Sequence, residues 1–273
     1  MNFLRYLLTF ILGKLADSQN NFVKNVLINI FIKLYAPNLK EAVFSEPDEY
    51  QSYNDFFIRK LKKETRPINT NLDVIVSPVD GEIIDFGKIT KDKLIQAKKY
   101  KYSVHDLIGE EFHKLFENGS YTTIYLAPRD YHRIHAPLEG QILYTNHIGN
   151  HLYPVNTKSQ YTVPSLYIKN ERGVIIIRNK NISYALVCIG AMVVGNIVPF
   201  WSKKNLVYRK DLIDCWKEGP EESKKNIIKG QEIAHFKMGS TVILIIDNDK
   251  YIDSNLLELN KSVKFGSKLI KIK

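Results

Sequence analysis

The stretch Thr241-Val242-Ile243-Leu244-Ile245-Ile246 is an uninterrupted run of β-branched and apolar residues, which indicates a strand buried on both faces. From about residue 74 onward, Gly, Pro and Asn separate other short runs of the same kind. These runs are Val74–Val76, Tyr121–Leu126, Gln141–Tyr144, Val174–Ile177 and Tyr184–Ile189. Short strands at this spacing predict a mostly antiparallel β core.

Upstream of the β core, two amphipathic stripes predict a pair of N-terminal helices, so the predicted fold class is α+β. Pro37 is expected to end the second helix. Two helices packed in a core would show this periodicity, and so would a pair lying in a membrane interface. The first stripe contains Leu4, Leu7, Leu8, Ile11, Leu12 and Leu15, and the second contains Phe22, Val23, Val26, Leu27, Ile30, Phe31 and Leu34.

The first stripe is too short to cross a membrane. Arg5 and Lys14 leave eight uncharged residues between them, whereas a span needs about 20. Residues 1–40 have a net charge of +4, and basic residues around exposed leucines suit an anionic leaflet. The composition changes near residue 40, so we divide the chain into membrane-associating helices at 1–40 and a larger domain at 41–273.

The charge balance favours a polyanionic partner. The chain of 273 residues has 39 Lys and Arg against 29 Asp and Glu, a net charge of +10, which suits nucleic acid or an anionic lipid surface. Its hydrophobic share of 44% excludes wholesale disorder and a polytopic membrane protein. Cys188 and Cys215 are too few for a disulfide framework and indicate a reducing compartment. Glu41–Thr70 is expected to be helical or irregular, and Trp201–Gln231 to be a long surface connection.

Three short segments place chemically capable residues beside predicted strands: Ser77–Gly81, Tyr131–Pro137 and Phe236–Thr241. Taken alone, Asp80-Gly81 is typical of a hairpin turn, and Gly239-Ser240 of a bend. Ser240, however, stands at the mouth of the buried strand, where the backbone holds a side chain rigidly.

The two histidines of the second segment invite a metal interpretation. On a strand, residues three apart point to opposite faces, so His132 and His135 would not share one ion, and we expect no metal site. Tyr131 and Arg133 fall on the same face as His135. Asp80, His135 and Ser240 could serve as orienter, base and nucleophile, although many proteins contain such a trio by chance.

Taken together, the motifs resemble those of the phosphatidylserine decarboxylase family, of the pyruvoyl-dependent, self-processing, bacterial membrane-associated type. The resemblance extends from about residue 50 to 250, and the N-terminal helices fit it. Met238 stands where the family usually has leucine or valine, a conservative change. The motifs are Val79-Asp80-Gly81, Tyr131-His132-Arg133-Ile134-His135 and Met238-Gly239-Ser240-Thr241, supported by Phe56–Leu61, Asn170–Arg172, Gly190–Gly195 and Lys229–Glu232.

The resemblance implies a proenzyme that cleaves itself between Gly239 and Ser240. The products would be a β chain, 1–239, and an α chain, 240–273, whose first residue becomes a pyruvoyl group, the covalent cofactor. His135, oriented by Asp80, would take the proton of the Ser240 hydroxyl and later return a proton to the substrate Cα. His132 would bind the substrate carboxylate or phosphate.

The implied reaction converts phosphatidylserine into phosphatidylethanolamine and CO2. A Schiff base to the pyruvoyl carbonyl would supply the electron sink that no ordinary side chain offers. The implied partners are phosphatidylserine, an anionic membrane, the protein's own α and β chains, and a second copy in a homodimer. The implied location is peripheral, on the cytoplasmic face of the cell membrane.

Two other classes stay open at this stage. A non-enzymatic basic β module on an anionic membrane would keep one chain near 31.6 kDa. A hydrolase using Asp80, His135 and Ser240 on an external substrate would react with a serine-directed phosphonate as an uncleaved chain. A nucleic-acid partner is not expected, because the aromatic residues are scattered and no established nucleic-acid-binding motif is visible.

Overall fold

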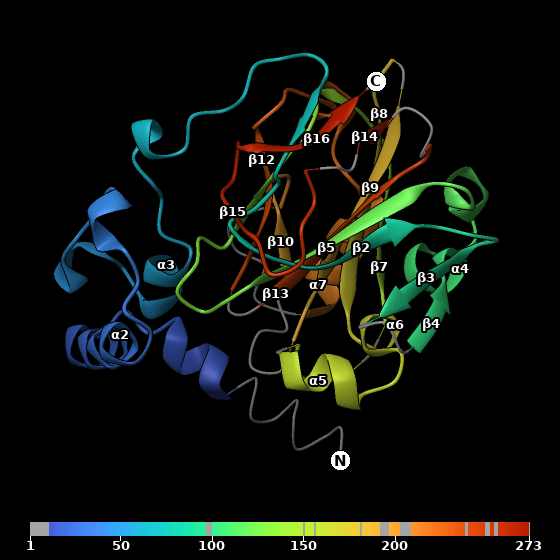
Figure 1. Cartoon of the computed structure of the whole chain (residues 1–273). Coiled ribbons are helices and arrows are strands. Elements are labelled where there is room, and N and C mark those ends of the chain that lie inside the picture. Colours follow the sequence, from blue (N-terminus) through green and yellow to red (C-terminus); the bar gives the residue numbers. More distant parts are fainter. Residues whose placement is uncertain are drawn as a thin grey trace.

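An eight-stranded antiparallel sheet forms the centre of the described structure (Figure 1). The structure is a computed structural model and describes residues 11–96, 100–149, 151–155, 157–180, 182–191, 197–202, 209–237, 240–248, 252–253 and 256–272. The strand order in this sheet is β11-β7-β8-β9-β13-β5-β2-β15. The bounds are β2 Gly81–Lys88, β5 Ser120–Leu126, β7 Gly140–Ile148, β8 Arg172–Arg178, β9 Ser183–Ile189, β11 Asn226–Ile227, β13 Ser240–Ile246 and β15 Ser262–Val263.

Both faces of the sheet are covered, which explains why β13 is apolar at successive positions. Val242, Leu244 and Ile246 belong to one hydrophobic cluster, and Ile243 and Ile245 belong to another. Because strand side chains alternate between faces, the two sets lie on opposite sides of the sheet. β13 pairs with β9 on one side and with β5 on the other, so it is a central strand.

Smaller sheets and helices supply these two covers. The face with Val242 packs against two three-stranded sheets, ordered β10-β12-β6 and β1-β16-β14, and the opposite face against β3, β4, α4 and α6. The bounds are β1 Val74–Val76, β3 Lys93–Gln96, β4 Tyr100–Ser103, β6 Arg133–His135, β10 Ile197–Pro199, β12 Glu232–Phe236, β14 Ile252–Asp253, β16 Lys268–Ile272, α4 Val104–Ile108 and α6 Leu166–Lys169.

The α+β fold and the antiparallel core are confirmed, and each predicted strand lies within an observed one. The expectation of a helical or irregular 41–70 segment is also confirmed by short helices there. Helices not yet named are η1 Leu39–Glu41, η2 Pro47–Glu49, α3 Tyr53–Phe57, η3 Lys63–Thr65, η4 His113–Phe116, α5 Thr157–Thr162 and η5 Glu222–Lys224.

The prediction of a surface connection at Trp201–Gln231 is wrong in its middle. Helix α7, Arg209–Glu218, occupies this stretch and buries Trp216 completely. The Trp216 indole N–H donates to the Ile197 carbonyl oxygen at 2.8 Å. The ring packs on Gly173, where a Cβ would collide with it, so a glycine in the sheet makes room for the helix.

The second N-terminal helix is confirmed as α2, Asn21–Tyr35. The side chain of Asn20 caps its start, and Ala36 ends it in the left-handed conformation at φ 45°. Residues 11–16 are also helical, whereas Leu4, Leu7 and Leu8 of the first predicted stripe lie outside the described residues. Figure 1 shows α2 and α3 together beside the β core.

Most of the predicted stripe of α2 faces away from the protein. The helix buries Ile28 and Phe31 in a small cluster with residues 50–57, but Phe22 is 79% and Leu34 is 68% exposed. Val26 and Ile30 are exposed as well. None of the helices in the described part of the chain has the length and hydropathy that a bilayer crossing requires. The boundary at residue 40 stays a prediction.

Candidate active site

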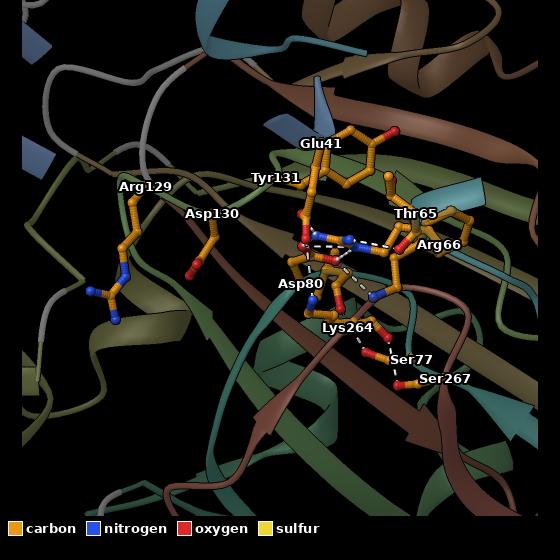
Figure 2. Close-up of polar contacts among 12 residues, drawn as sticks. Glu41, Thr65, Arg66, Ser77, Asp80, Arg129, Asp130, Tyr131, Lys264 and Ser267 are labelled. Atoms are coloured by element: carbon orange, nitrogen blue, oxygen red, sulfur yellow. Dashed lines mark hydrogen bonds and ion pairs between the residues drawn. The ribbon is translucent and has the colours of Figure 1, made fainter. Parts of the chain in front are cut away.

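Asp80 lies in the turn between β1 and β2 (Figure 2). Its carboxylate accepts hydrogen bonds from Arg66 Nε, at 3.0 and 3.1 Å, and from Arg66 Nη2, at 2.5 Å. The Phe265 backbone N–H also donates to it, at 2.8 Å. Gly81 follows, where a Cβ would collide with the Tyr125 carbonyl oxygen of β5. This close approach fixes Asp80 at the start of β2, beside β5.

Arg66 joins Asp80 to Glu41. Both Arg66 and Glu41 belong to residues 11–66, which precede the β core and which we call the N-terminal layer. Its Nη2 lies 2.7 Å from Glu41 Oε2, and its side chain is 7% exposed. The hydrogen bond from Arg66 holds the pKa of Glu41 below its ordinary value. Burial alone would lower the pKa of Arg66, but its hydrogen bonds to Asp80 and Glu41 raise it. The cluster is therefore a partly buried set of charges, held by a bidentate arginine.

His135 ends β6, and both of its ring nitrogens have partners. Nδ1 lies 2.9 Å from the Gly230 carbonyl oxygen, and Nε2 lies 3.0 Å from the Tyr131 hydroxyl. Because a carbonyl can only accept, Nδ1 carries the hydrogen and Nε2 presents the lone pair. Burial lowers the pKa of His135 to about 4, so the imidazole is neutral at pH 7. Its ring stacks on Phe265 at 3.6 Å.

His132 lies just before β6 and is completely buried. Its Nδ1 lies 2.8 Å from the Asp130 carbonyl oxygen, which leaves the Nε2 lone pair without a hydrogen-bond partner among the described residues. The ring packs on Phe57 of α3 at a centroid distance of 4.2 Å. Burial lowers the pKa of His132 to about 3. The two histidines have separate surroundings, in line with the predicted opposite faces.

Ser240 is the first residue of β13, and its backbone pairs with Leu126 at the end of β5. Met238 and Gly239 lie outside the described residues. Five residues after Leu126, the chain reaches Tyr131 and then His132, whose carbonyl oxygen accepts from the Phe236 N–H at 3.0 Å. Loop 127–131 therefore connects the partner of Ser240 to the partner of Phe236.

The structure brings the backbones of the three predicted segments together. β13, β5 and β2 are neighbours, with Thr241 opposite Tyr125 and Tyr125 opposite Glu82. Adjacent strands lie about 4.8 Å apart, so the backbone of Glu82, two residues after Asp80, lies roughly 10 Å from that of Thr241, which follows Ser240. The third segment joins them through the His135 N–H, which donates to the Pro78 carbonyl oxygen at 2.9 Å.

The expected direct contact between Asp80 and His135 is absent from the hydrogen bonds of the described residues. The carboxylate of Asp80 is hydrogen-bonded to Arg66. The imidazole of His135 is hydrogen-bonded to the Gly230 carbonyl oxygen and the Tyr131 hydroxyl. Phe265 contacts both groups, with its N–H on Asp80 and its ring on His135. A direct orienting hydrogen bond is therefore not the arrangement found here.

Sequence reasoning missed Glu41, Arg66 and Phe265, which come from distant positions and carry no pattern of their own. It placed Tyr131 beside His135 correctly. Arg133, two residues before His135 on β6, donates to the Ile58 carbonyl oxygen and to Glu232. Within the described part of the chain, no group of three or more His, Cys, Asp or Glu side chains could hold a metal ion.

Comparison with known proteins identifies the family of this chain. The phosphatidylserine decarboxylase family profile matches residues 53–271. A protein of Citrobacter koseri named phosphatidylserine decarboxylase proenzyme is 35% identical over 266 residues, covering 96% of this chain and 83% of its own length. Proteins of the same name from Hamiltonella defensa and a Shewanella species are 38% identical, covering 92% and 90% of this chain and 89% and 85% of their own lengths. The chain therefore belongs to the phosphatidylserine decarboxylase family.

Proposed function

We propose that this chain is a self-processing proenzyme that, once cleaved between Gly239 and Ser240, decarboxylates phosphatidylserine to phosphatidylethanolamine. The observation that carries the proposal is the convergence of the family's three motifs. Asp80 directly precedes β2 and Ser240 begins β13, the two strands that flank β5, and β6 ends at His135, whose N–H donates to the Pro78 carbonyl oxygen. Family membership supports the reaction and the substrate.

Self-cleavage needs a base for the Ser240 hydroxyl, and His135 supports that role. It is neutral at pH 7, and its Nδ1 bond to Gly230 leaves the lone pair on Nε2. As that nitrogen takes the proton, Ser240 Oγ attacks the Gly239 carbonyl carbon and the peptide C–N bond breaks, which leaves an ester and a free amine. The Tyr131 hydroxyl donates to the same nitrogen, so it must relay the proton or yield its place.

The ester then eliminates. The Ser240 Cα loses a proton, the Gly239 carboxylate leaves, and water converts the resulting dehydroalanine into a pyruvoyl group and ammonia. That group would supply an electron sink for decarboxylation. His132 lies close to the cleavage segment, because its carbonyl oxygen accepts from the Phe236 N–H. We assign His135 to the returning proton and His132 to the substrate carboxylate or phosphate. The Nε2 lone pair of His132 only accepts hydrogen bonds, so binding an anion requires the ring to take up a proton or to turn its N–H away from the Asp130 carbonyl oxygen.

A peripheral position on an anionic membrane supports access to a lipid substrate. Phe22, Val26, Ile30 and Leu34 form an exposed apolar stripe along α2, in a chain of net charge +10. Flotation with phosphatidylserine vesicles in high salt tests this role, because salt screens charges but not apolar burial. Phe22→Glu, Leu34→Glu protein should cleave itself but fail to float, and unchanged flotation would remove the anchor role. Self-association into a homodimer stays a prediction.

Intact mass of the denatured protein tests the central proposal. The wild type should give two chains that meet at Gly239 and Ser240, the second carrying a pyruvoyl terminus, and should release CO2 from phosphatidylserine. Ser240→Ala should give one chain near 31.6 kDa without activity. Wild type that stays at one chain would favour the basic module or the hydrolase, and the same fragments from Ser240→Ala would exclude serine-dependent cleavage.

A further inference from the structure

A cavity of about 220 Å3 lies between the N-terminal layer and the β core. Ala36, Asn38, Glu41, Arg59, Leu61 and Arg66 line one side, and residues 80–81, 129–131 and 262–264 line the other. Pockets for drug-sized ligands usually hold about 300 Å3 or more, so this space suits a small polar group.

The positively charged side chains that line the cavity outnumber the negatively charged ones. Arg66 and Lys264 lie near Glu41 and Asp80, which balance them. The remaining lining charges are Arg59 and Arg129 against Asp130, whose carboxylate accepts from the Ala127 N–H at 2.7 Å. Figure 2 shows Arg129 and Asp130 set apart from the Arg66 cluster. One positive charge is left over, which a singly charged anion would neutralise.

Arg59 differs from Arg172, with which it forms the two least exposed arginines among the described residues. Arg172 is 2% exposed, and its Nε, Nη1 and Nη2 all donate to backbone carbonyl oxygens, which is the pattern of a structural residue. Arg59 is 4% exposed, and only its Nη2 has partners, the carbonyl oxygens of Arg129 and Asp130.

The remaining nitrogens of Arg59 are unusual for a buried cation. Nε and Nη1 are buried without a hydrogen-bond partner, and the guanidinium has no ion pair with a described carboxylate. Burying an arginine in this state is costly unless an acceptor arrives. A guanidinium fork suits the paired oxygens of a phosphodiester or carboxylate.

The position of the cavity points to the source of that anion. Ala36 ends α2, whose exposed apolar stripe we propose to lie in lipid, and Asp80 and Tyr131 border the proposed catalytic residues. A lipid held here would have its headgroup between the membrane-facing helix and the site of chemistry. A phosphodiester carries the single negative charge that the lining lacks.

We propose that this cavity binds the phosphodiester of the lipid headgroup, with Arg59 as its principal cation and Arg129 at its exposed rim. The inference rests on the proposed function and deepens it by naming the part of the substrate that is held. The amine and carboxylate of the serine would then extend past Asp80 and Tyr131 toward the site of reaction.

The test compares Arg59→Gln, Arg59→Lys and Arg129→Ala with Lys60→Ala, an exposed cation beside Arg59 that does not line the cavity. The substrate is dihexanoyl phosphatidylserine below its micelle concentration, and self-cleavage reports folding. Arg59→Gln should raise KM at least about tenfold, or 1.4 kcal/mol, with little change in kcat. Arg59→Lys should recover part of this loss, Arg129→Ala should raise KM about threefold, and Lys60→Ala should match the wild type.

Product inhibition identifies the group that Arg59 binds. Dihexanoyl phosphatidylethanolamine keeps the phosphodiester and lacks the carboxylate, so its inhibition constant should rise by the same factor as KM. A rise in KM alone would assign Arg59 to the carboxylate and overturn the proposal. Inorganic phosphate that competes with substrate in the wild type, while Arg59→Gln leaves the lipid KM unchanged, would show a free-phosphate site and overturn it as well.

A binding measurement separates this inference from the proposed function. Uncleaved Ser240→Ala protein can be titrated calorimetrically with dihexanoyl phosphatidylethanolamine, with and without Arg59→Gln. Binding that depends on Arg59 would support the cavity even if the wild type proved inactive. Normal wild-type turnover, with unchanged KM and binding in all Arg59 variants that fold, would reject the cavity and leave the proposed function intact.

Discussion

His132 and His135 lie three residues apart, yet opposite ends of the chain hold them. Phe57 of the N-terminal layer packs on His132, and Phe265 of the C-terminal segment stacks on His135. Each Nδ1 bonds a backbone carbonyl oxygen, so both rings present Nε2 as an acceptor. The Tyr131 hydroxyl takes the lone pair of His135, whereas that of His132 has no partner among the described residues.

This difference in hydrogen bonding suits the two histidines to different roles. His135 lies in a hydrogen-bonded network that already supplies and accepts protons, as a base requires. The unpaired nitrogen of His132 is a buried acceptor, which suits a group that arrives with a donor. The pair also gives the N-terminal layer a structural part in the candidate site, because its Phe57 packs on His132.

The largest expected effect separates the two histidines by self-cleavage. Asn at either position can keep the hydrogen bond of Nδ1 while removing the Nε2 lone pair. His135→Asn should slow cleavage roughly a thousandfold, since a positioned base contributes about 10²–10⁴. His132→Asn should cleave within about tenfold of the wild type but decarboxylate poorly. Gels of freshly synthesised precursor measure the rates, and equal rates for the two variants would end the distinction.

A smaller effect tests how Asp80 influences His135. Asp80→Asn should slow cleavage roughly 10- to 100-fold, because the turn that carries Phe265 loses its charged acceptor. Phe265→Leu should slow it about tenfold by freeing the imidazole. If Asp80 acts through Phe265, the double variant should be no slower than Asp80→Asn alone.

The control for this cycle is Asp73→Asn, which removes an exposed carboxylate 3.7 Å from Lys271 and should leave cleavage unchanged. Fully additive effects of Asp80→Asn and Phe265→Leu would instead favour a direct action of Asp80 that forms only when Ser240 reacts.

The smallest effect concerns acid stability. Burial lowers the folded pKa of His135 to about 4 and of His132 to about 3, below the ordinary value of 6.5. The unfolded chain therefore binds more protons between these values, so stability is lost as the pH falls below about 6.5. Each histidine should cost about 1.5 kcal/mol of unfolding free energy between pH 6.5 and 5.

Urea unfolding of uncleaved Ser240→Ala protein measures this loss at each pH. Adding His132→Asn or His135→Asn should each make the loss about 1.5 kcal/mol smaller. A pH dependence identical to that of the parent in both variants would show that neither ring is held neutral.

The sequence predicted the strands because each is buried on one or both faces, so that its apolar residues fall in runs. It did not predict α7, because among the described side chains of that charged helix only Leu212 and Trp216 are buried, and the room for Trp216 comes from Gly173 on strand β8. The motif residues could be recognised at the site, but Arg66 and Phe265 could not. Their roles depend on tertiary contacts with Asp80 that span 14 and 185 positions.

Because β13 is a central strand, a cut before Ser240 would change the kinetic order of folding. If the chain is cut before Ser240, the shorter product carries a central strand held between β9 and β5, and also β15 and β16, which pair with β2 and β1 of the longer product. Folding of the precursor is a first-order event, but reassembly of the two products would be second order and would fail on dilution. The cleaved enzyme, once its two chains had separated, would therefore reassemble poorly at low protein concentration.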